Sequence, residues 1–212
     1  MHKQLLTLLF IGITTILTAQ TSTEAELQIL KTPKQIENYL EIKNSKKNKL
    51  ITFNEEKHKT ILAKDLFKLH VGATKVNEGE FEKTFYKVIN KSKNTYHRVA
   101  YIYLDASTYS IPEINNLREK IIAQYNNGAS FDFLANQYSM DSNANKGGDS
   151  GWFLKGDMHS DFENEVLNEN HSLNDIFTID IPSEKWYYVV LKTHEAKEIS
   201  EIDVLKIVEA KE

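Results

Sequence analysis

The sequence predicts an α+β fold in which a small, mostly antiparallel sheet packs against flanking helices. Residues 99–104 are β-branched and aromatic, as is typical of a buried strand. Three helix-start signals follow between residues 110 and 163, and two further strand-like stretches, 175–179 and 186–192, come after them. Strands on both sides of a run of helices indicate a sheet that is covered by those helices.

The composition fits a globular protein of modest size. The chain has 212 residues, of which 41% are hydrophobic and 26% charged, enough for one domain and a smaller appendage. The net charge is -4, whereas proteins that bind the phosphate backbone usually carry a basic surface, so nucleic acid is not expected as a partner. There is no cysteine, so stability must come from packing rather than disulfides.

Residues 1–19 are predicted to be a signal peptide. His2 and Lys3 precede an uncharged, largely apolar run at residues 5–17, and small residues before Gln20 permit cleavage after Ala19. An uncleaved anchor is the alternative, but the run is shorter than the ~20 residues that a bilayer crossing needs. We therefore expect an exported protein, periplasmic or secreted, without a stable membrane span after cleavage. The absence of a cysteine after the run argues against a lipoprotein.

Residues 20–95 are predicted to form an N-terminal extension. Pro33, Ile36 and Tyr39 indicate a short helix, and the leucine stripe at 62, 66 and 69 indicates another. Strands are expected at 50–53 and at 85–89, the latter pairing with the strand that follows it. No motif assigns a role to this segment, which leaves open a packing extension that steadies the next domain, or an arm that binds client proteins.

Residues 96–194 carry the clearest signals. Ser110 and Glu113 form the sequence pattern of a capping box, and Gly128 is placed to end the helix that they begin. Ser130 is positioned to cap a second helix. A second capping-box pattern, at Ser160 and Glu163, is expected to begin a third helix. Residues 195–212 are predicted to be a C-terminal tail or strand extension.

Four short motifs in this domain carry a family resemblance. They are QYSMD at 137–141, GGDSGWF at 147–153, GDM at 156–158 and the pair Phe162–Glu163. Their order and spacing resemble those of the parvulin-type (PpiC/rotamase) peptidyl-prolyl cis-trans isomerases, over roughly half of the chain. The resemblance implies a parvulin-like fold, isomerase activity without a cofactor or metal, and unfolded or extended proline-containing polypeptides as partners.

The chemistry explains why such residues are needed. Rotation about an X-Pro amide crosses a barrier of roughly 20 kcal/mol because the twisted state loses resonance, and the enzyme must only bind the twisted form best. By resemblance, Met158 and Phe162 form the socket for the proline ring together with Phe153, and His159 lies at its rim. Plain core packing is the alternative for Met158 and Phe162.

The polar candidates are Asp141, Thr178, Tyr101 and Tyr188. Asp141 lies where the family places a cysteine or aspartate that faces the rotating amide, although a turn aspartate is the alternative. Thr178 matches a threonine whose hydroxyl joins the central hydrogen-bond network. Tyr101 and Tyr188 occupy the two positions at which the family carries histidine. Phenols donate and accept hydrogen bonds as imidazoles do, but they do not titrate near neutrality.

The sequence therefore predicts a peptidyl-prolyl isomerase, a foldase that acts on exported unfolded proteins. Because both histidines are replaced, a non-catalytic parvulin-like chaperone or protein-binding module is the alternative. An assembly or scaffold role centred on residues 20–95 is a weaker third possibility.

Overall fold

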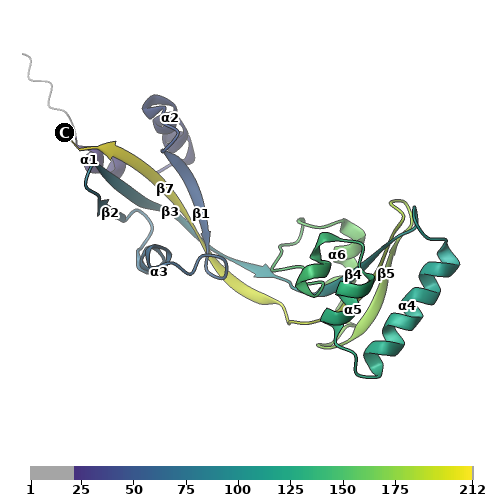
Figure 1. Ribbon diagram of the computed structural model, residues 1–212. Coiled ribbons are helices and arrows are strands. Elements are labelled where there is room, and N and C mark those ends of the chain that lie inside the picture. The colour runs from purple at the N-terminus through teal and green to yellow at the C-terminus, as the bar shows by residue number, and fades with distance from the viewer. Residues whose placement is uncertain (1–21, 212) are drawn as a thin grey trace, which may run out of the picture. The chain divides into compact units, whose positions relative to one another are not determined.

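The computed structural model describes residues 22–211, which divide into two compact units (Figure 1). Of these residues, 22–51, 69–89 and 204–211 form the first unit, and 52–68 and 90–203 form the second. The signal peptide predicted for residues 1–19 lies outside the described residues. Within residues 22–211, no helix has the length and apolar character that a bilayer crossing requires.

The first unit contains two short helices, α1 (Thr23–Ile29) and α2 (Pro33–Lys43), and the strand β2 (Thr74–Glu78). The helix expected at Pro33 is confirmed, and Thr32 and Gln35 cap it reciprocally. Three longer strands have part of their length here: β1 (Lys49–Asn54), β3 (Glu82–Tyr96) and β7 (Lys197–Ala210). Fully or nearly fully buried side chains pack α1 and α2 against this part of the sheet, namely Leu27, Ile36, Phe85, Leu205 and Ile207.

The sheet that these strands form has the order β1-β7-β3-β2. The strand expected at residues 85–89 exists within β3, but the prediction that it pairs with the next strand is wrong. Instead, β3 lies between β7 and β2, and it pairs antiparallel with β2 from Thr74–Lys87 to Glu78–Lys83. Pairing with β7 joins segments more than a hundred residues apart, which no local pattern in the sequence encodes.

The second unit is built on a three-stranded sheet of order β4-β6-β5. Its strands are β4 (Ala100–Asp105), β5 (Ile176–Ile181) and β6 (Trp186–Leu191), and β6 pairs antiparallel with both neighbours. The helices are α3 (Ile61–Lys68), α4 (Ile111–Asn126), α5 (Phe131–Tyr138), the 3-10 helix η1 (Ser142–Lys146) and α6 (Ser160–Val166). The predicted α+β fold with a small antiparallel sheet and flanking helices is confirmed.

Strand alternation gives this sheet two different apolar faces. One face packs on α4 and α5, where Ile102, Ile114 and Ile121 have no exposed surface and each contributes roughly 1.5–3 kcal/mol by burial. The opposite face, which carries Tyr101, Tyr188 and Val190, packs on α6 and on the segment that leads into it. The second face therefore brings the aromatic residues of the predicted site together.

Two of the three predicted helix caps are confirmed. Ser110 donates its amide to Glu113 at 2.7 Å at the start of α4, and the hydroxyl of Ser130 accepts from the amide of Phe133 at 3.2 Å at the start of α5. The capping box at Ser160 is wrong. His159 is the N-cap of α6, and its Nδ1 accepts a 3.3 Å hydrogen bond from the amide of Asp161.

Candidate functional site

Three aromatic rings form the centre of the candidate site. Tyr101 on β4 and Tyr188 on β6 meet edge to face with 5.7 Å between ring centroids. Phe162 on α6 contacts both of them, at 5.7 Å from Tyr101 and 5.1 Å from Tyr188. Edge-to-face aromatic pairs are each worth ~0.5–1.5 kcal/mol beyond the area that they bury, so the three rings hold one another in place.

Asp141 is attached directly to this centre. The Tyr101 hydroxyl donates a 2.7 Å hydrogen bond to Oδ2 of Asp141, and the Ser142 hydroxyl donates to Oδ1 at 3.1 Å. Burial acts to raise the pKa of Asp141, but these hydrogen bonds and those from neighbouring backbone amides outweigh it, so that the pKa lies below its ordinary value. The carboxylate is therefore ionised at neutral pH and fixed in orientation.

The two phenols behave in the opposite way. Burial raises the pKa of Tyr101, and its hydrogen bond to Asp141 and the negative charge of that carboxylate raise the pKa further. Burial likewise raises the pKa of Tyr188, with smaller contributions from Tyr103 and Asp141. Both phenols are therefore neutral at physiological pH and keep their protons for hydrogen bonding.

The apolar candidates line the same face. Phe153 and Phe162 are each only 3% exposed and belong to the buried cluster, whereas Met158 is partly buried and packs against that cluster. An adaptable thioether and flat aromatic rings together form an apolar surface suited to contact a small apolar ring. His159, next to Met158, lies at the margin with its ring 5.8 Å from that of Trp186.

Thr178 is not brought to this cluster. It lies on β5 opposite Val189 and is exposed, whereas its neighbour Ile179 is buried and pairs with Tyr188. Because successive residues of a strand face opposite sides of a sheet, the phase of β5 places Ile179, and not Thr178, on the face of the aromatic rings.

Glu163 is a site residue that sequence reasoning gave another role. Its carboxylate is 4% exposed and accepts hydrogen bonds from the amide of Gly156, at 2.7 and 2.9 Å, and from the amide of Met158 at 3.0 Å. Glu163 thus fixes the backbone from which the Met158 side chain projects. The available signal was that Glu163 follows Phe162, a predicted socket residue. The amides that its carboxylate binds depend on the loop conformation, which the sequence pattern does not show.

Tyr103 and Trp186 were also missed. Their rings lie on the same face as Tyr188, with centroid distances of 5.4 Å from Tyr103 to Tyr188 and 6.5 Å from Tyr103 to Trp186. The alternation of strand residues places 101 with 103 on β4, and 186 with 188 on β6. That period of two was the signal that would have found them.

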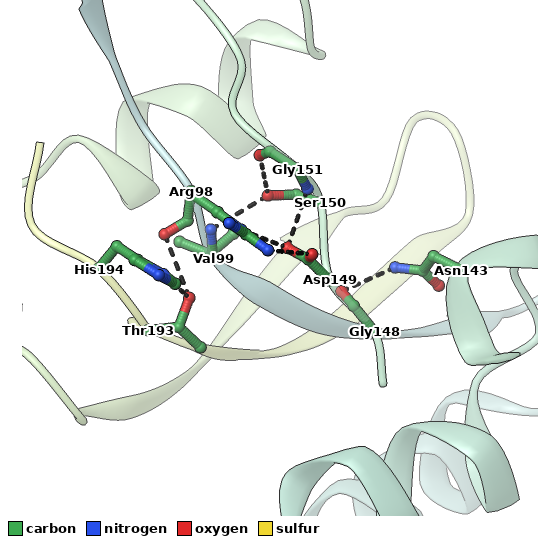
Figure 2. Close-up of polar contacts among 9 residues, drawn as sticks. All are labelled: Arg98, Val99, Asn143, Gly148, Asp149, Ser150, Gly151, Thr193 and His194. Atoms are coloured by element: carbon green, nitrogen blue, oxygen red, sulfur yellow. Dashed lines mark hydrogen bonds and ion pairs between the residues drawn. The ribbon is translucent and has the colours of Figure 1, made fainter. Parts of the chain in front are cut away.

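The glycine-rich turn is fastened to β4 beside the site (Figure 2). Arg98 binds the Asp149 carboxylate through two atoms, at 2.8 and 2.5 Å, and the Ser150 hydroxyl accepts from the amide of Val99 at 3.1 Å. Gly148 has φ +76°, and a Cβ there would lie 2.4 Å from the carbonyl oxygen of Tyr101. Only glycine permits this close approach of the turn to the strand that carries Tyr101.

The glycine-rich turn is also hydrogen-bonded to the segment that follows Asp141. In Figure 2, the side chain of Asn143 points to the turn, and its amide donates to the carbonyl oxygen of Gly148 at 2.9 Å. On the other side, the Thr193 hydroxyl donates to the carbonyl oxygen of Arg98 at 3.3 Å. The turn therefore ties β4 to the Asp141 segment.

Within the described part of the chain, no group of three or more His, Cys, Asp or Glu side chains has the arrangement to hold a metal ion.

The second unit thus combines a small antiparallel sheet with flanking helices, a carboxylate that is hydrogen-bonded to an aromatic cluster, and a glycine-rich turn tied to β4. The family model described as the PPIC-type PPIase domain matches residues 83–195, more than half of the chain. The chain therefore belongs to the PPIC-type peptidyl-prolyl isomerase family.

Three solved structures are similar to part of the chain. PrsA from Bacillus subtilis is 26% identical with a TM-score of 0.38, over 47% of this chain and 35% of that chain. The peptidylprolyl isomerase PrsA from Bacillus anthracis is 26% identical with a TM-score of 0.39, over 49% of this chain and 44% of that one. A PpiC-type peptidyl-prolyl cis-trans isomerase domain is 24% identical with a TM-score of 0.42, over 50% of this chain and 94% of that one.

The chain thus matches less than half the length of either PrsA protein. No curated protein matched the sequence.

Proposed function

We propose that this protein catalyses cis-trans isomerisation of X-Pro bonds in unfolded, exported polypeptides, with Tyr101, Asp141 and Tyr188 at the reacting amide. The observation that carries the proposal is the 2.7 Å hydrogen bond between Tyr101 and Asp141, beside the apolar surface of Phe162 and Met158. An ionised, oriented carboxylate and an apolar wall for the proline ring favour the twisted amide over the planar one.

The apolar surface binds the ring of the substrate proline. Met158 and Phe162 contact the pyrrolidine, with Phe153 in the same cluster, and exclude water from one side of the amide. A planar amide is more dipolar than a twisted one because resonance moves charge from nitrogen to oxygen. A drier environment therefore raises the free energy of the planar form relative to that of the twisted form.

The polar groups stabilise the twisted amide. When resonance is lost, the carbonyl carbon becomes more electron-poor, and the Asp141 carboxylate offers it a fixed negative charge. The Tyr188 hydroxyl has no hydrogen-bond partner among residues 22–211 and is available to donate to the substrate carbonyl oxygen. Tyr101 holds Asp141 in place. No proton is transferred, so the loss of the family's two histidines does not remove a required acid or base.

Export and client class are further parts of this proposal. Export is supported by the apolar run at residues 5–17, which has the length and composition of the apolar part of a signal peptide. The clients are extended, proline-containing chains in the periplasm or the medium. An extended chain is suited to a surface of partly exposed rings, because it presents proline and the neighbouring side chains together.

The experiment that tests the proposal measures the isomerisation rate of X-Pro tetrapeptides by the mature chain, by Asp141→Asn and by Phe162→Ala. We expect each substitution to lower kcat/KM by roughly 10-fold or more, since each removes an interaction made in the transition state. Asp175→Asn, in the turn before β5, is the matched control. Circular dichroism establishes that each variant is folded.

One observation favours the alternative function, a non-catalytic chaperone, and the same experiment tests it. One of the two phenols already uses its hydroxyl proton to bind Asp141, which leaves a single free donor at the centre. If no peptide is isomerised, while the wild-type chain binds unfolded protein and suppresses its aggregation, the isomerase proposal is overturned in favour of the chaperone. Undiminished turnover by Asp141→Asn would show instead that catalysis does not depend on this carboxylate.

A further inference from the structure

The aromatic surface continues past the proposed catalytic centre. Tyr103 is the in-register partner of Tyr188 across β4 and β6, and Trp186 lies two residues before Tyr188 on the same face. The ring of Tyr103 meets that of Trp186 at 6.5 Å and an angle of 84°. His159, at the start of α6, completes the row with its ring 5.8 Å from Trp186.

This row differs from the buried cluster in its exposure. Phe153 and Phe162 are buried, whereas Tyr103, Trp186 and His159 each keep part of their ring surface accessible. Trp186 packs in part against the buried cluster around Phe162, whereas Tyr103 does not belong to that cluster. Contiguous, partly exposed aromatic surface is a common feature of peptide-binding sites.

The covalent structure of the substrate determines what reaches this row. Along the segment that leads into β4, Phe153 lies beside His97 and Val99; Tyr101 follows on β4, and Tyr103 comes last. Two residues of a strand advance ~7 Å, a distance that the backbone step of ~3.4 Å to the next peptide residue and the length of a large side chain on it together cover. With the proline ring on Phe162 and the amide at Asp141, the next group along this line is the side chain of residue X, which precedes the proline.

The polar surroundings of the row limit the charge of X. Asp105 follows Tyr103 by two residues on the same face of β4, and Asp141 is hydrogen-bonded to Tyr101 on that face, so two carboxylates lie near this ring. Burial raises the pKa of Tyr103, and these two carboxylates raise it further. Lys185 directly precedes Trp186 at the start of β6, and its carbonyl oxygen accepts a 2.9 Å hydrogen bond from the amide of Ala106. Met140, which is 40% exposed, adds an apolar edge and donates its amide to the carbonyl oxygen of Tyr103 at 2.9 Å.

We infer that Tyr103, Trp186 and His159 form a subsite that selects an aromatic side chain immediately before proline and disfavours an acidic one. The inference rests on the proposed function in one respect: it takes the proline ring to lie on Phe162 and Met158. An aromatic X meets ring edges from three elements. An acidic X meets the carboxylates of Asp105 and Asp141.

The test compares the tetrapeptides Ala-X-Pro-Ala with X = Phe, Ala and Glu. Dissociation constants are measured by NMR titration and kcat/KM by an isomerisation assay, so that binding is read without turnover. We expect the Phe peptide to bind roughly 3- to 10-fold more tightly than the Ala peptide, and the Glu peptide to bind most weakly. Trp186→Ala should bring the Phe-to-Ala affinity ratio close to one, and Trp186→Phe should restore most of it.

Phe133→Ala is the matched control, because Phe133 is a 58% exposed ring on α5, apart from the row. It should leave the Phe-to-Ala ratio at its wild-type value. Equal affinities for Phe and Ala peptides, or an equal loss of both in Trp186→Ala, would overturn the subsite even if X-Pro bonds are isomerised. A Trp186-dependent preference without any turnover would support the subsite and overturn the catalytic proposal instead.

Discussion

The hydroxyl of Tyr101 and the carboxylate of Asp141 form a 2.7 Å hydrogen bond between β4 and the segment that precedes η1. Each group favours the present protonation state of the other: the pKa of the carboxyl is lowered, and the pKa of the phenol is raised. Neither titrates near neutrality. This pair therefore provides a fixed charge where a histidine would provide one that depends on pH.

The first prediction concerns the pH dependence of this pair. Between about pH 5 and 9, wild-type kcat/KM should not change through titration of Asp141, Tyr101 or Tyr188, because none of these groups gains or loses a proton in that range. In Tyr101→Phe the hydrogen bond is lost while burial still acts on Asp141, so the pKa of Asp141 rises and an acid limb enters the profile. The measurement is kcat/KM against pH for both proteins. A profile of Tyr101→Phe that matches the wild type at every pH would contradict this account.

The second prediction concerns Glu163 as a positioning residue for Met158. Glu163→Ala leaves the amides of Gly156 and Met158 without their acceptor, which should lower the free energy of unfolding by ~1–3 kcal/mol. It should also raise KM for X-Pro peptides more than it lowers kcat, because the socket loses its fixed backbone.

Glu163→Gln keeps one acceptor oxygen and should recover part of both losses. Denaturant unfolding and steady-state kinetics measure the two effects separately. A loss of stability with an unchanged KM would limit Glu163 to a structural role.

The third prediction concerns Arg98 and Asp149. Asp149→Asn removes the bidentate pair and should lower the free energy of unfolding by about 1 kcal/mol at pH 7, because the pair is partly exposed and screened by solvent. The Arg98 hydrogen bonds lower the pKa of Asp149 in the folded protein against the opposing effect of burial.

The sign of the pH dependence follows from that shift. The stabilisation is present above the unfolded-state pKa of Asp149 and is lost as pH falls through the lower folded-state value. The wild type and Asp149→Asn should therefore converge in stability below about pH 4. Urea denaturation at several pH values measures this, and a difference that grows as the pH falls would contradict it.

The fourth prediction compares two glycines that share a positive φ. In Gly148→Ala, backbone strain adds to a 2.4 Å clash with the carbonyl oxygen of Tyr101, whereas Gly128→Ala at φ +97° meets no atom within 4 Å. Gly128→Ala should cost roughly 1–2 kcal/mol, and Gly148→Ala distinctly more. Isomerisation should also fall in Gly148→Ala, since β4 carries Tyr101. Thermal unfolding and the peptide assay compare the two variants, and equal stability losses would show that the clash is relieved.

Much of the second unit was predictable because its signals are local. The strands, the amphipathic spacing of α4 and the caps at Ser110 and Ser130 depend on neighbours within a few residues. The cap of α6 was not predictable, since N-cap preferences favour Ser160 over His159, the residue that caps the helix. The choice between them follows from Glu163, which binds the loop at Gly156 and Met158 instead of the backbone at Ser160.

The candidate site likewise contains residues that the sequence indicated and one that depended on strand pairing. Motif spacing and family resemblance were enough to indicate Tyr101, Tyr188 and Phe162, which the structure brings into one cluster. Thr178 was not placed there because a shift of one residue in strand phase exchanges the two faces of β5. That phase depends on the pairing of β5 with β6, which a residue pattern does not fix.

The sheet order β1-β7-β3-β2 has a consequence for biosynthesis. Among the strands of residues 22–211, β7 is made last, yet it is the hydrogen-bonded neighbour of β1, which is made first. On a ribosome, the contiguous segment from β4 to β6 is complete while β1 still lacks its partner. Until the residues after 197 emerge, β1 and one edge of β3 expose unpaired backbone groups of the kind that other chains add to. A nascent chain of this protein therefore carries open strand edges until β7 has been made.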